Sequence, residues 1–162
     1  AGRLDLYRSQ VRLPELLAQM VDTYKMQALS KGVKFHFQAL SKLPEVVICD
    51  EKRLRQVLNN LLSNAVKYTA QGQVDFSVRY RNQVAEFTIR DTGIGIEEEA
   101  LERIFHPFER VRDSHSSNIP GSGLGLTIVK LLAEIMGGDF QVESKIKQGS
   151  CFKVSLMLPW VA

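Results

Sequence analysis

This sequence of 162 residues lacks long hydrophobic runs. No stretch approaches the roughly 20 consecutive apolar residues that a transmembrane helix needs, and the first residues lack the features of a signal peptide. We therefore expect a cytoplasmic polypeptide that makes no direct contact with a membrane. A membrane anchor elsewhere in a longer parent chain is compatible with this pattern.

The sequence also has few cysteines and a small net charge. The two cysteines, Cys49 and Cys151, lie far apart in apolar, strand-like contexts. Two cysteines supply neither a metal cluster nor a disulfide framework, so we expect a reduced, buried pair. Lys and Arg number 21 against 18 Asp and Glu, a net charge of +3, and no basic run is interleaved with aromatic residues. This balance argues against nucleic acid as a partner.

The composition that remains is typical of one globular domain. With 44% hydrophobic and 24% charged residues, a chain of this length can bury a core of its own. We therefore expect a single domain over residues 1–162.

Hydrophobic periodicity predicts the elements of this domain. Alternation predicts strands within 4–13 and over 33–37, 46–49, 73–80, 84–90, 139–146 and 151–158. Helical spacing predicts helices over 14–31, 51–68, 97–105 and 124–136. Asp50 suits the N-cap of the second helix, and 106–123 reads as irregular. This order predicts an α/β (α+β) two-layer sandwich, a mixed, mostly antiparallel sheet covered on one face by about three helices.

Three groups of residues suggest chemistry, and the first lies on the 51–68 helix. Asn60, Asn64 and Lys67 share one narrow polar arc beside the apolar stripe. An amide oxygen suits the oxygen shell of Mg²⁺, and a lysine one turn on can meet phosphate oxygens. The alternative is an ordinary solvated helix face, although asparagine is a poor helix former and twice in a helix interior needs a reason.

The second group is Asp91-Thr-Gly93-Ile-Gly95-Ile96, directly after a predicted strand. A carboxylate there can accept a hydrogen bond from an exocyclic amine such as that of adenine. The two glycines allow a sharp turn and close approach of the backbone to a ligand. A plain Asp-x-Gly turn is the alternative.

The third group is Gly121-Ser-Gly123-Leu-Gly125-Leu126, which opens the last predicted helix. Free N–H groups at a helix N-terminus suit an anion. No Gly-x4-Gly-Lys-Ser/Thr is present, which excludes a P-loop. No strand runs into these glycines, which excludes a dinucleotide fingerprint. A flexible loop before a helix remains the alternative.

Four segments follow one another along the chain: the Asn-rich helix, the Asp-x-Gly-x-Gly turn, the aromatic stretch Phe105-His-Pro-Phe108-Glu-Arg110 and the Gly-x-Gly-x-Gly segment. In this order they resemble the N, G1, F and G2 boxes of the histidine kinase catalytic domain. That domain is part of the ATPase superfamily shared with DNA gyrase, heat-shock chaperones and mismatch-repair ATPases. The resemblance covers nearly the whole chain, including the lead-in from Asp50 and the last strands. It implies a Bergerat-type ATP-binding fold with ATP and Mg²⁺ as cofactors.

The resemblance also implies roles for individual residues. Asn64 would ligate Mg²⁺, Asp91 would bind the adenine amine, and residues 111–122 would form a lid. The residues acting on the phosphates in catalysis would be Asn60, Lys67 and Arg110. The rest of the nucleotide site would be Tyr68 near the base, Gly93, Gly95 and Ile96 around its pocket, Phe105, and Gly121, Ser122, Gly123, Leu124, Gly125, Leu126 and Thr127 around the phosphates.

One position separates kinases from ATP hydrolases in this superfamily. Gyrase-type members place a water-activating glutamate where this chain has Asn60. An amide cannot take a proton at neutral pH, so the site would hold ATP without hydrolysing it efficiently.

The implied function is that of a protein-histidine kinase, which transfers the γ-phosphoryl group of MgATP to a histidine in the first step of two-component signal transduction. The motif around that acceptor histidine, a His followed by an acidic residue and then Arg or Thr and Pro, is missing here. His36 reads as a sheet residue, His106 as part of the aromatic stretch and His115 as part of the lid.

We therefore expect the acceptor on a separate phosphoacceptor and dimerisation domain, which would make the parent protein a homodimer, and no autophosphorylation by residues 1–162 alone. The receiver domain of a response regulator would be the next partner. The alternative is a nucleotide-sensing or interaction module that keeps the fold and transfers no phosphoryl group.

Overall fold

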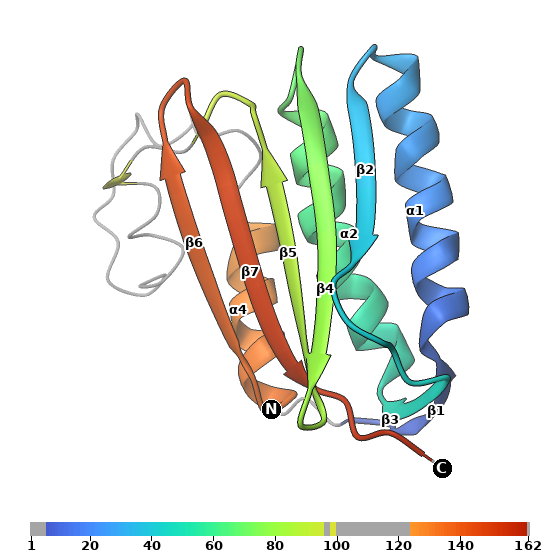
Figure 1. Ribbon diagram of the computed structural model, residues 1–162. Coiled ribbons are helices and arrows are strands. Elements are labelled where there is room, and N and C mark those ends of the chain that lie inside the picture. The colour runs from blue at the N-terminus through green and yellow to red at the C-terminus, as the bar shows by residue number, and fades with distance from the viewer. Residues whose placement is uncertain (1–5, 96–97, 100–123, 162) are drawn as a thin grey trace.

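A five-stranded sheet with helices on one face forms the body of the molecule (Figure 1). The computed structural model describes residues 6–95, 98–99 and 124–161. β2 is parallel to β4, and the other neighbouring pairs are antiparallel. The predicted mixed, mostly antiparallel sheet is thereby confirmed. Its strands, in spatial order, are β2 (Lys34–Ala39), β4 (Gln73–Arg81), β5 (Val84–Asp91), β7 (Gly149–Met157) and β6 (Asp139–Lys145).

Three helices in the described residues cover one face of this sheet, α1 (Leu13–Ser30), α2 (Glu51–Lys67) and α4 (Leu124–Ile135) (Figure 1). Of the helix predicted over 97–105, only 98–99 are described, and they are helical. Within the described part of the chain, no helix has the length and apolar character to cross a membrane. The core between the two layers is built by large, fully buried side chains that include Phe76, Phe87, Leu54, Leu58, Leu61, Leu62, Ile89, Leu132 and Leu156.

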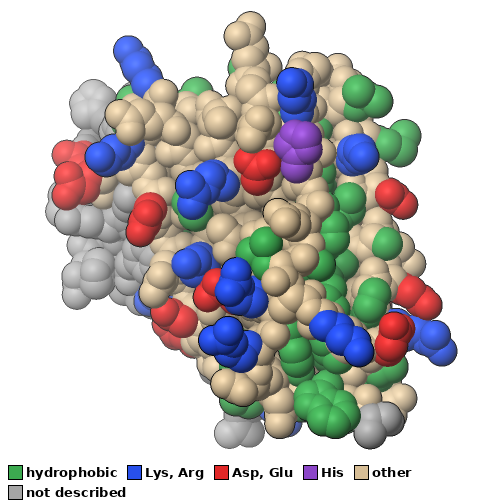
Figure 2. All heavy atoms as spheres, in the orientation of Figure 1, with side chains coloured by type: hydrophobic (Ala, Val, Ile, Leu, Met, Phe, Trp, Pro, Cys, Tyr) green, Lys and Arg blue, Asp and Glu red, His purple; other side chains and the backbone are tan. Residues whose placement is uncertain are grey.

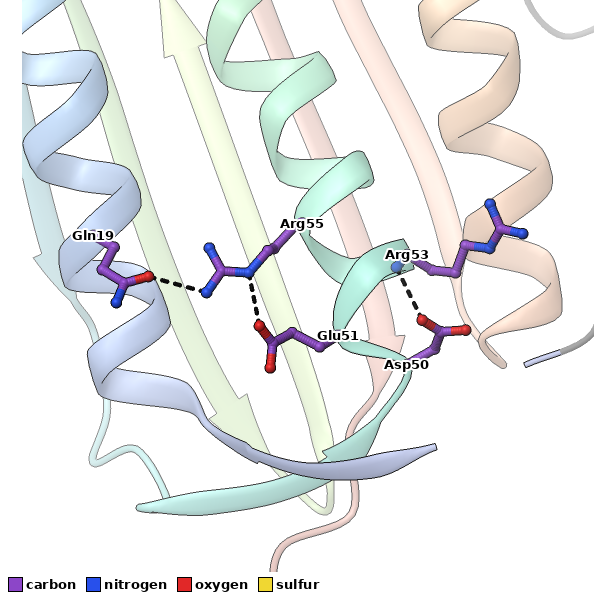
Figure 3. A network of polar contacts seen from close by, with 5 residues as sticks. All are labelled: Gln19, Asp50, Glu51, Arg53 and Arg55. Carbon is purple, nitrogen blue, oxygen red and sulfur yellow. Dashed lines mark hydrogen bonds and ion pairs between the residues drawn. The ribbon is translucent and has the colours of Figure 1, made fainter. Parts of the chain in front are cut away.

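The second helix, α2, begins where its N-cap predicts. Oδ1 of Asp50 accepts a hydrogen bond from the backbone N–H of Arg53 at 3.1 Å (Figure 3), which satisfies one of the amides that a helix start leaves unpaired. Oδ2 of the same carboxylate accepts from the backbone N–H of Tyr7 at 2.9 Å. Asp50 therefore ties the lead-in segment to the start of α2.

Side chains of α2 also contact α1. Arg55 pairs with Glu51 of its own helix at 2.9 Å and donates to the side-chain oxygen of Gln19 at 3.0 Å (Figure 3). Further along the same helices, the hydroxyl of Tyr24 donates to Oδ1 of Asn59 at 2.7 Å. These contacts align α2 beside α1.

A second, two-stranded sheet lies at one end of the molecule (Figure 1). In it, β1 (Ser9–Arg12) pairs antiparallel with β3 (Val46–Cys49). The other edge of β3 carries the C-terminal tail, since Ile48 N–H donates to Pro159 O at 2.8 Å and Val161 N–H to Val46 O at 3.0 Å. The sequence pattern predicts the strands but not this separate sheet.

The face of the main sheet opposite the helices is polar, with basic and acidic side chains intermixed (Figure 2). The strand register places His36, Asp75, Arg90 and Cys151 next to one another across it. Cys151 is half-buried there and accepts from Arg90 at 3.6 Å. Cys49 is buried, and burial, helped by neighbouring carboxylates, raises the pKa of its thiol to about 12. Both thiols are free, and the expected burial holds only for Cys49.

Candidate functional site

The Asn-rich stretch forms the C-terminal half of α2. Asn60 and Asn64 are half-buried and Lys67 is exposed, all on one side of the helix. Nδ2 of Asn60 donates to the backbone carbonyl of Gly125 on α4 at 3.3 Å. The side chain of Asn64 makes no hydrogen bond with any other described residue. Its amide oxygen is therefore available to a ligand.

The last turn of α2 is held in place from α1. Nζ of Lys31, at the C-cap of α1, donates to the carbonyls of Val66 at 2.6 Å and Lys67 at 2.9 Å, groups that a helix end leaves unpaired. Tyr68 caps α2, and its N–H donates to Asn64 O at 3.0 Å. Nζ of Lys67 lies 5.2 Å from the centroid of the Tyr68 ring, a cation–π distance.

Asp91, at the end of β5, is buried with 6% of its surface exposed. Its Oδ1 accepts two backbone hydrogen bonds, from Gly93 at 2.9 Å and from Ser150 at 3.2 Å. Burial raises the pKa of this carboxyl, and the two backbone donors partly offset that rise. Oδ2 has no hydrogen-bond partner among the described residues. An acceptor oxygen without a partner on a buried carboxylate residue is the strongest sign of a ligand in the described part of the chain.

The glycines after Asp91 are closely packed. A Cβ at Gly93 would lie 2.5 Å from the backbone oxygen of Tyr68. Gly95 adopts a left-handed φ of 79°, and a Cβ there would lie 2.1 Å from the backbone oxygen of Lys145. The turn is therefore confined between the end of α2 and the β6–β7 hairpin, a space that excludes side chains.

The start of α4 faces α2. Gly125 accepts the hydrogen bond of Asn60, while Leu126 is buried and Thr127 half-buried. A Cβ at Gly125 would meet nothing closer than Cγ of Asn60 at 3.8 Å, an ordinary contact. Glycine at this position is therefore not demanded by packing within the described residues.

The structure thus brings the three groups of residues together around the C-terminal half of α2. Gly93 packs on the helix end at Tyr68, and Gly125 lies against Asn60. Other predicted site residues lie outside the described residues, or outside the described side chains in the case of Leu124: Ile96, Phe105, Arg110, Gly121, Ser122, Gly123 and the 111–122 lid.

The side-chain oxygens at this site fit MgATP, the ligand that the resemblance implies. Oδ2 of Asp91 is an acceptor suited to an amine, and the amide oxygen of Asn64 is a hard ligand of the kind that Mg²⁺ prefers. No cluster of three or more His, Cys, Asp or Glu capable of holding a metal occurs among the described residues. A metal there would therefore depend on the amide and on oxygens brought by a ligand.

Sequence reasoning missed two contributors to this site, Ser150 and Lys31. Ser150 lies directly opposite Asp91 across β5 and β7, although 59 residues separate them. The only sequence signal was a Gly-Ser pair at the start of the last predicted strand. For Lys31 no local pattern points to the end of another helix.

This fold and this arrangement of motifs define an ATP-binding domain of the histidine kinase type. The chain belongs to the family described as "Histidine kinase-, DNA gyrase B-, and HSP90-like ATPase", whose model matches residues 49–159.

Named relatives within the family are sensor kinases. The chain is 40% identical over 162 residues to the aerobic respiration control sensor protein ArcB of Escherichia coli K12, covering 99% of this chain and 21% of ArcB. It is 34% identical to the autoinducer 2 sensor kinase/phosphatase LuxQ of Vibrio vulnificus, covering 96% and 19%. The chain thus spans about a fifth of the length of these curated relatives.

Solved structures that are similar to this chain include that of a histidine kinase catalytic domain. Full-length ShkA in complex with AMPPNP matches with a TM-score of 0.81 and 32% identity, over 100% of this chain and 33% of ShkA. The catalytic domain of histidine kinase ThkA matches with a TM-score of 0.73 and 25% identity, over 93% of this chain and 97% of that domain.

Proposed function

We propose that this domain binds MgATP and supports transfer of its γ-phosphoryl group to a histidine on a separate phosphoacceptor and dimerisation domain. The observation that carries the proposal is Oδ2 of the buried residue Asp91, which has no partner among the described residues and lies beside a turn too tight for side chains. The relationship to sensor kinases, and to a structure containing an ATP analogue, supports the same conclusion.

Base recognition falls to Asp91 in this proposal. Oδ1 is used by the backbone, and Oδ2 accepts from the exocyclic amine of adenine. Guanine carries a carbonyl at that position and would face the carboxylate with a second acceptor. Gly93 and Gly95 let the backbone lie close to the base, and Tyr68 lies near it.

Metal and phosphate recognition falls to α2 and the glycine-rich segment. The amide oxygen of Asn64 ligates Mg²⁺, while Asn60 and Lys67 approach the phosphates. The same proposal covers residues outside the described part or on α4: Ile96, Phe105, Arg110, Gly121, Ser122, Gly123, Leu124, Gly125, Leu126 and Thr127, with 111–122 as the lid.

Bound MgATP supplies the phosphoryl group, and a P–N bond to the acceptor imidazole forms as the P–O bond to the ADP leaving group breaks. The chain's own residues orient the phosphates and neutralise their charge. Asn60 has no basic group, and its amide already donates to Gly125, so it does not activate water.

The partners follow from this chemistry. The acceptor histidine lies on the phosphoacceptor and dimerisation domain, through which the parent protein forms a homodimer. The receiver domain of a response regulator takes the phosphoryl group next. Domain 1–162 alone does not autophosphorylate, because none of its three histidines has the acceptor motif.

The test combines binding with transfer. Calorimetry should detect ATP binding that strengthens with Mg²⁺ and that exceeds GTP binding. Radiolabelled ATP should leave acid-labile label on a supplied acceptor domain and none on residues 1–162. Tight, Mg²⁺-dependent binding without transfer to any cognate acceptor would instead favour a nucleotide-sensing module.

A further inference from the structure

The β6–β7 hairpin contacts the turn after Asp91 at several points. Lys147 N–H donates to Ile94 O at 2.7 Å, and a Cβ at Gly95 would collide with Lys145 O. Gly149 has a left-handed φ of 97°, and a Cβ there would lie 2.1 Å from the backbone oxygen of Asp91. The hairpin and the turn are therefore packed backbone against backbone.

One of these contacts reaches the carboxylate itself. The N–H of Ser150 donates to Oδ1 of Asp91 at 3.2 Å, and both residues are buried. The second donor, Gly93, belongs to the same turn as the aspartate. Of the two donors found among the described residues, Ser150 is therefore the one that links the Asp91 carboxylate to the neighbouring strand β7.

Ser144 on β6 secures the position of that donor. It lies opposite Ser150 in the β6–β7 register. Its hydroxyl donates to Gly149 O at 3.0 Å, and the oxygens of the Ser144 and Ser150 hydroxyls are 2.7 Å apart. Because the single Ser144 proton goes to Gly149, the Ser150 hydroxyl donates to Ser144. Two side-chain hydrogen bonds therefore join β6 to the first two residues of β7.

We propose that Ser144 is a positioning residue for adenine recognition, acting through Gly149 and Ser150 on the carboxylate of Asp91. The Ser144 hydroxyl bonds to Gly149 and Ser150, and the Ser150 backbone N–H donates to Asp91, so this effect passes through the hairpin backbone. The inference rests on the proposed function only for the expected effect of Ser144 on adenosine binding. The placement of the carboxylate can be tested without any nucleotide.

Ser144→Ala removes the side-chain bonds to Gly149 and Ser150 and should loosen the Ser150 donor from Oδ1. A carboxylate that loses an N–H donor is harder to ionise, so the pKa of Asp91 should rise above its value in the unsubstituted domain. Adenosine affinity should fall about 3- to 10-fold, the range of one or two lost hydrogen bonds. The gain in affinity from adenosine to MgATP should stay unchanged, because the phosphate contacts are on α2 and α4.

Two further variants separate positioning from general damage. Ser144→Thr keeps the hydroxyl and should restore both readouts. Ser77→Ala removes a half-buried serine of β4 that makes no side-chain hydrogen bond within the described residues, and it should change neither.

The measurements are a carbon-13 NMR titration of the Asp91 carboxyl in the nucleotide-free domain and calorimetry with adenosine. An unchanged Asp91 titration in a folded Ser144→Ala variant would overturn the inference, whatever the binding result. If the unsubstituted domain binds no adenosine, or binds it independently of Asp91, the proposed function fails while the titration still decides the role of Ser144.

Discussion

The side-chain amide of Asn60 donates to the backbone carbonyl of Gly125 at 3.3 Å, across 65 residues of sequence. This bond joins α2 to the first turn of α4, the two helices that carry the asparagines and the end of the glycine-rich segment. It requires a donor at residue 60, which a carboxylate at neutral pH does not have.

Asn60→Asp should therefore destabilise the domain. A carboxylate oxygen would replace the donor and face the carbonyl of Gly125, at a cost of about 1–3 kcal/mol in the free energy of unfolding. Denaturant unfolding measures this. Asn59→Asp is the matched control, because Asn59 uses its oxygen to accept from Tyr24 and a carboxylate accepts equally well. Equal stability of the two variants would contradict the assigned orientation of the Asn60 amide.

Asp91→Asn should separate binding from folding. The amide oxygen can still accept from Gly93 and Ser150, whereas the amide nitrogen puts a donor in the place of Oδ2. We expect a folded variant with adenosine affinity reduced about ten- to hundred-fold, the value of a hydrogen bond to a charged acceptor. Calorimetry checks the affinity and thermal unfolding checks the fold. A folded variant with unchanged affinity rules out Asp91 as the base-recognition residue.

Adenosine affinity should also depend on pH. Burial raises the pKa of Asp91 above its ordinary value of 3.8, and the proposed contact uses the ionised form. Affinity should be constant at neutral pH and fall by up to about tenfold per pH unit below the folded-state pKa. Titration calorimetry from neutral pH down to the lowest pH at which the domain stays folded is the measurement. The Asp91→Asn variant should show no such fall.

The raised pKa of Asp91 affects folding stability in the opposite direction from adenosine affinity: acid weakens binding but removes a cost to stability. Because the folded state holds this proton more tightly than the unfolded chain, the ionised carboxylate lowers stability above the folded-state pKa. That cost disappears as the pH falls from the folded-state pKa to the unfolded value. Asp91→Asn should therefore gain stability relative to the unsubstituted domain at neutral pH and lose that advantage in acid.

Asn64→Ala should weaken binding of Mg²⁺–ATP by about tenfold or more, the range seen when even the supports of metal ligands are removed. Binding of adenosine should be unchanged, since the proposed role is with the metal. Asn59→Ala, an exposed asparagine on the same helix, should leave both affinities intact. Equal losses for the two ligands in the Asn64 variant would remove the metal role.

Gly125→Ala should stabilise the free domain and weaken Mg²⁺–ATP binding. The new Cβ has ordinary contacts, and replacing a helical glycine by alanine gains up to about 1 kcal/mol. The proposed approach of phosphates to this backbone would be obstructed. Gly93→Ala contrasts with it, because its Cβ would lie 2.5 Å from Tyr68 O and should lower stability as well. Unimpaired binding by a more stable Gly125 variant would exclude Gly125 from the site.

Local sequence pattern was sufficient where local physics decides the structure. The bounds of α2 follow from a capping aspartate and an apolar stripe, and the predicted helix agrees to within a residue. The β4–β5 hairpin likewise follows from two alternating runs around Asn82, where Asn82 and Gln83 both have positive φ. The order of the boxes assigns Asn60, Asp91 and Gly125 to one nucleotide site, and that assignment stays a prediction.

Contacts between distant segments were not predictable in this way. The pairing of β1 with β3 depends on a partner more than 30 residues away, and strand alternation does not name partners. The contact of Ser150 with Asp91 depends on the register of β5 against β7, and the one between Lys31 and the end of α2 on how two helices pack. The roles assigned to Asn64, Lys67 and Arg110 stay predictions.

The position of β3 between β1 and the C-terminal tail has a mechanical consequence. Both flanking segments run antiparallel to β3, and therefore parallel to each other. Tension that draws the two ends of the chain apart would pull β1 toward the Cys49 end of β3 and the tail toward the Val46 end. The hydrogen bonds on both edges of β3 would then be loaded together in shear rather than opened one by one. A pulling force between flanking segments would meet β1, β3 and the C-terminal tail before it reached the sheet that carries Asp91.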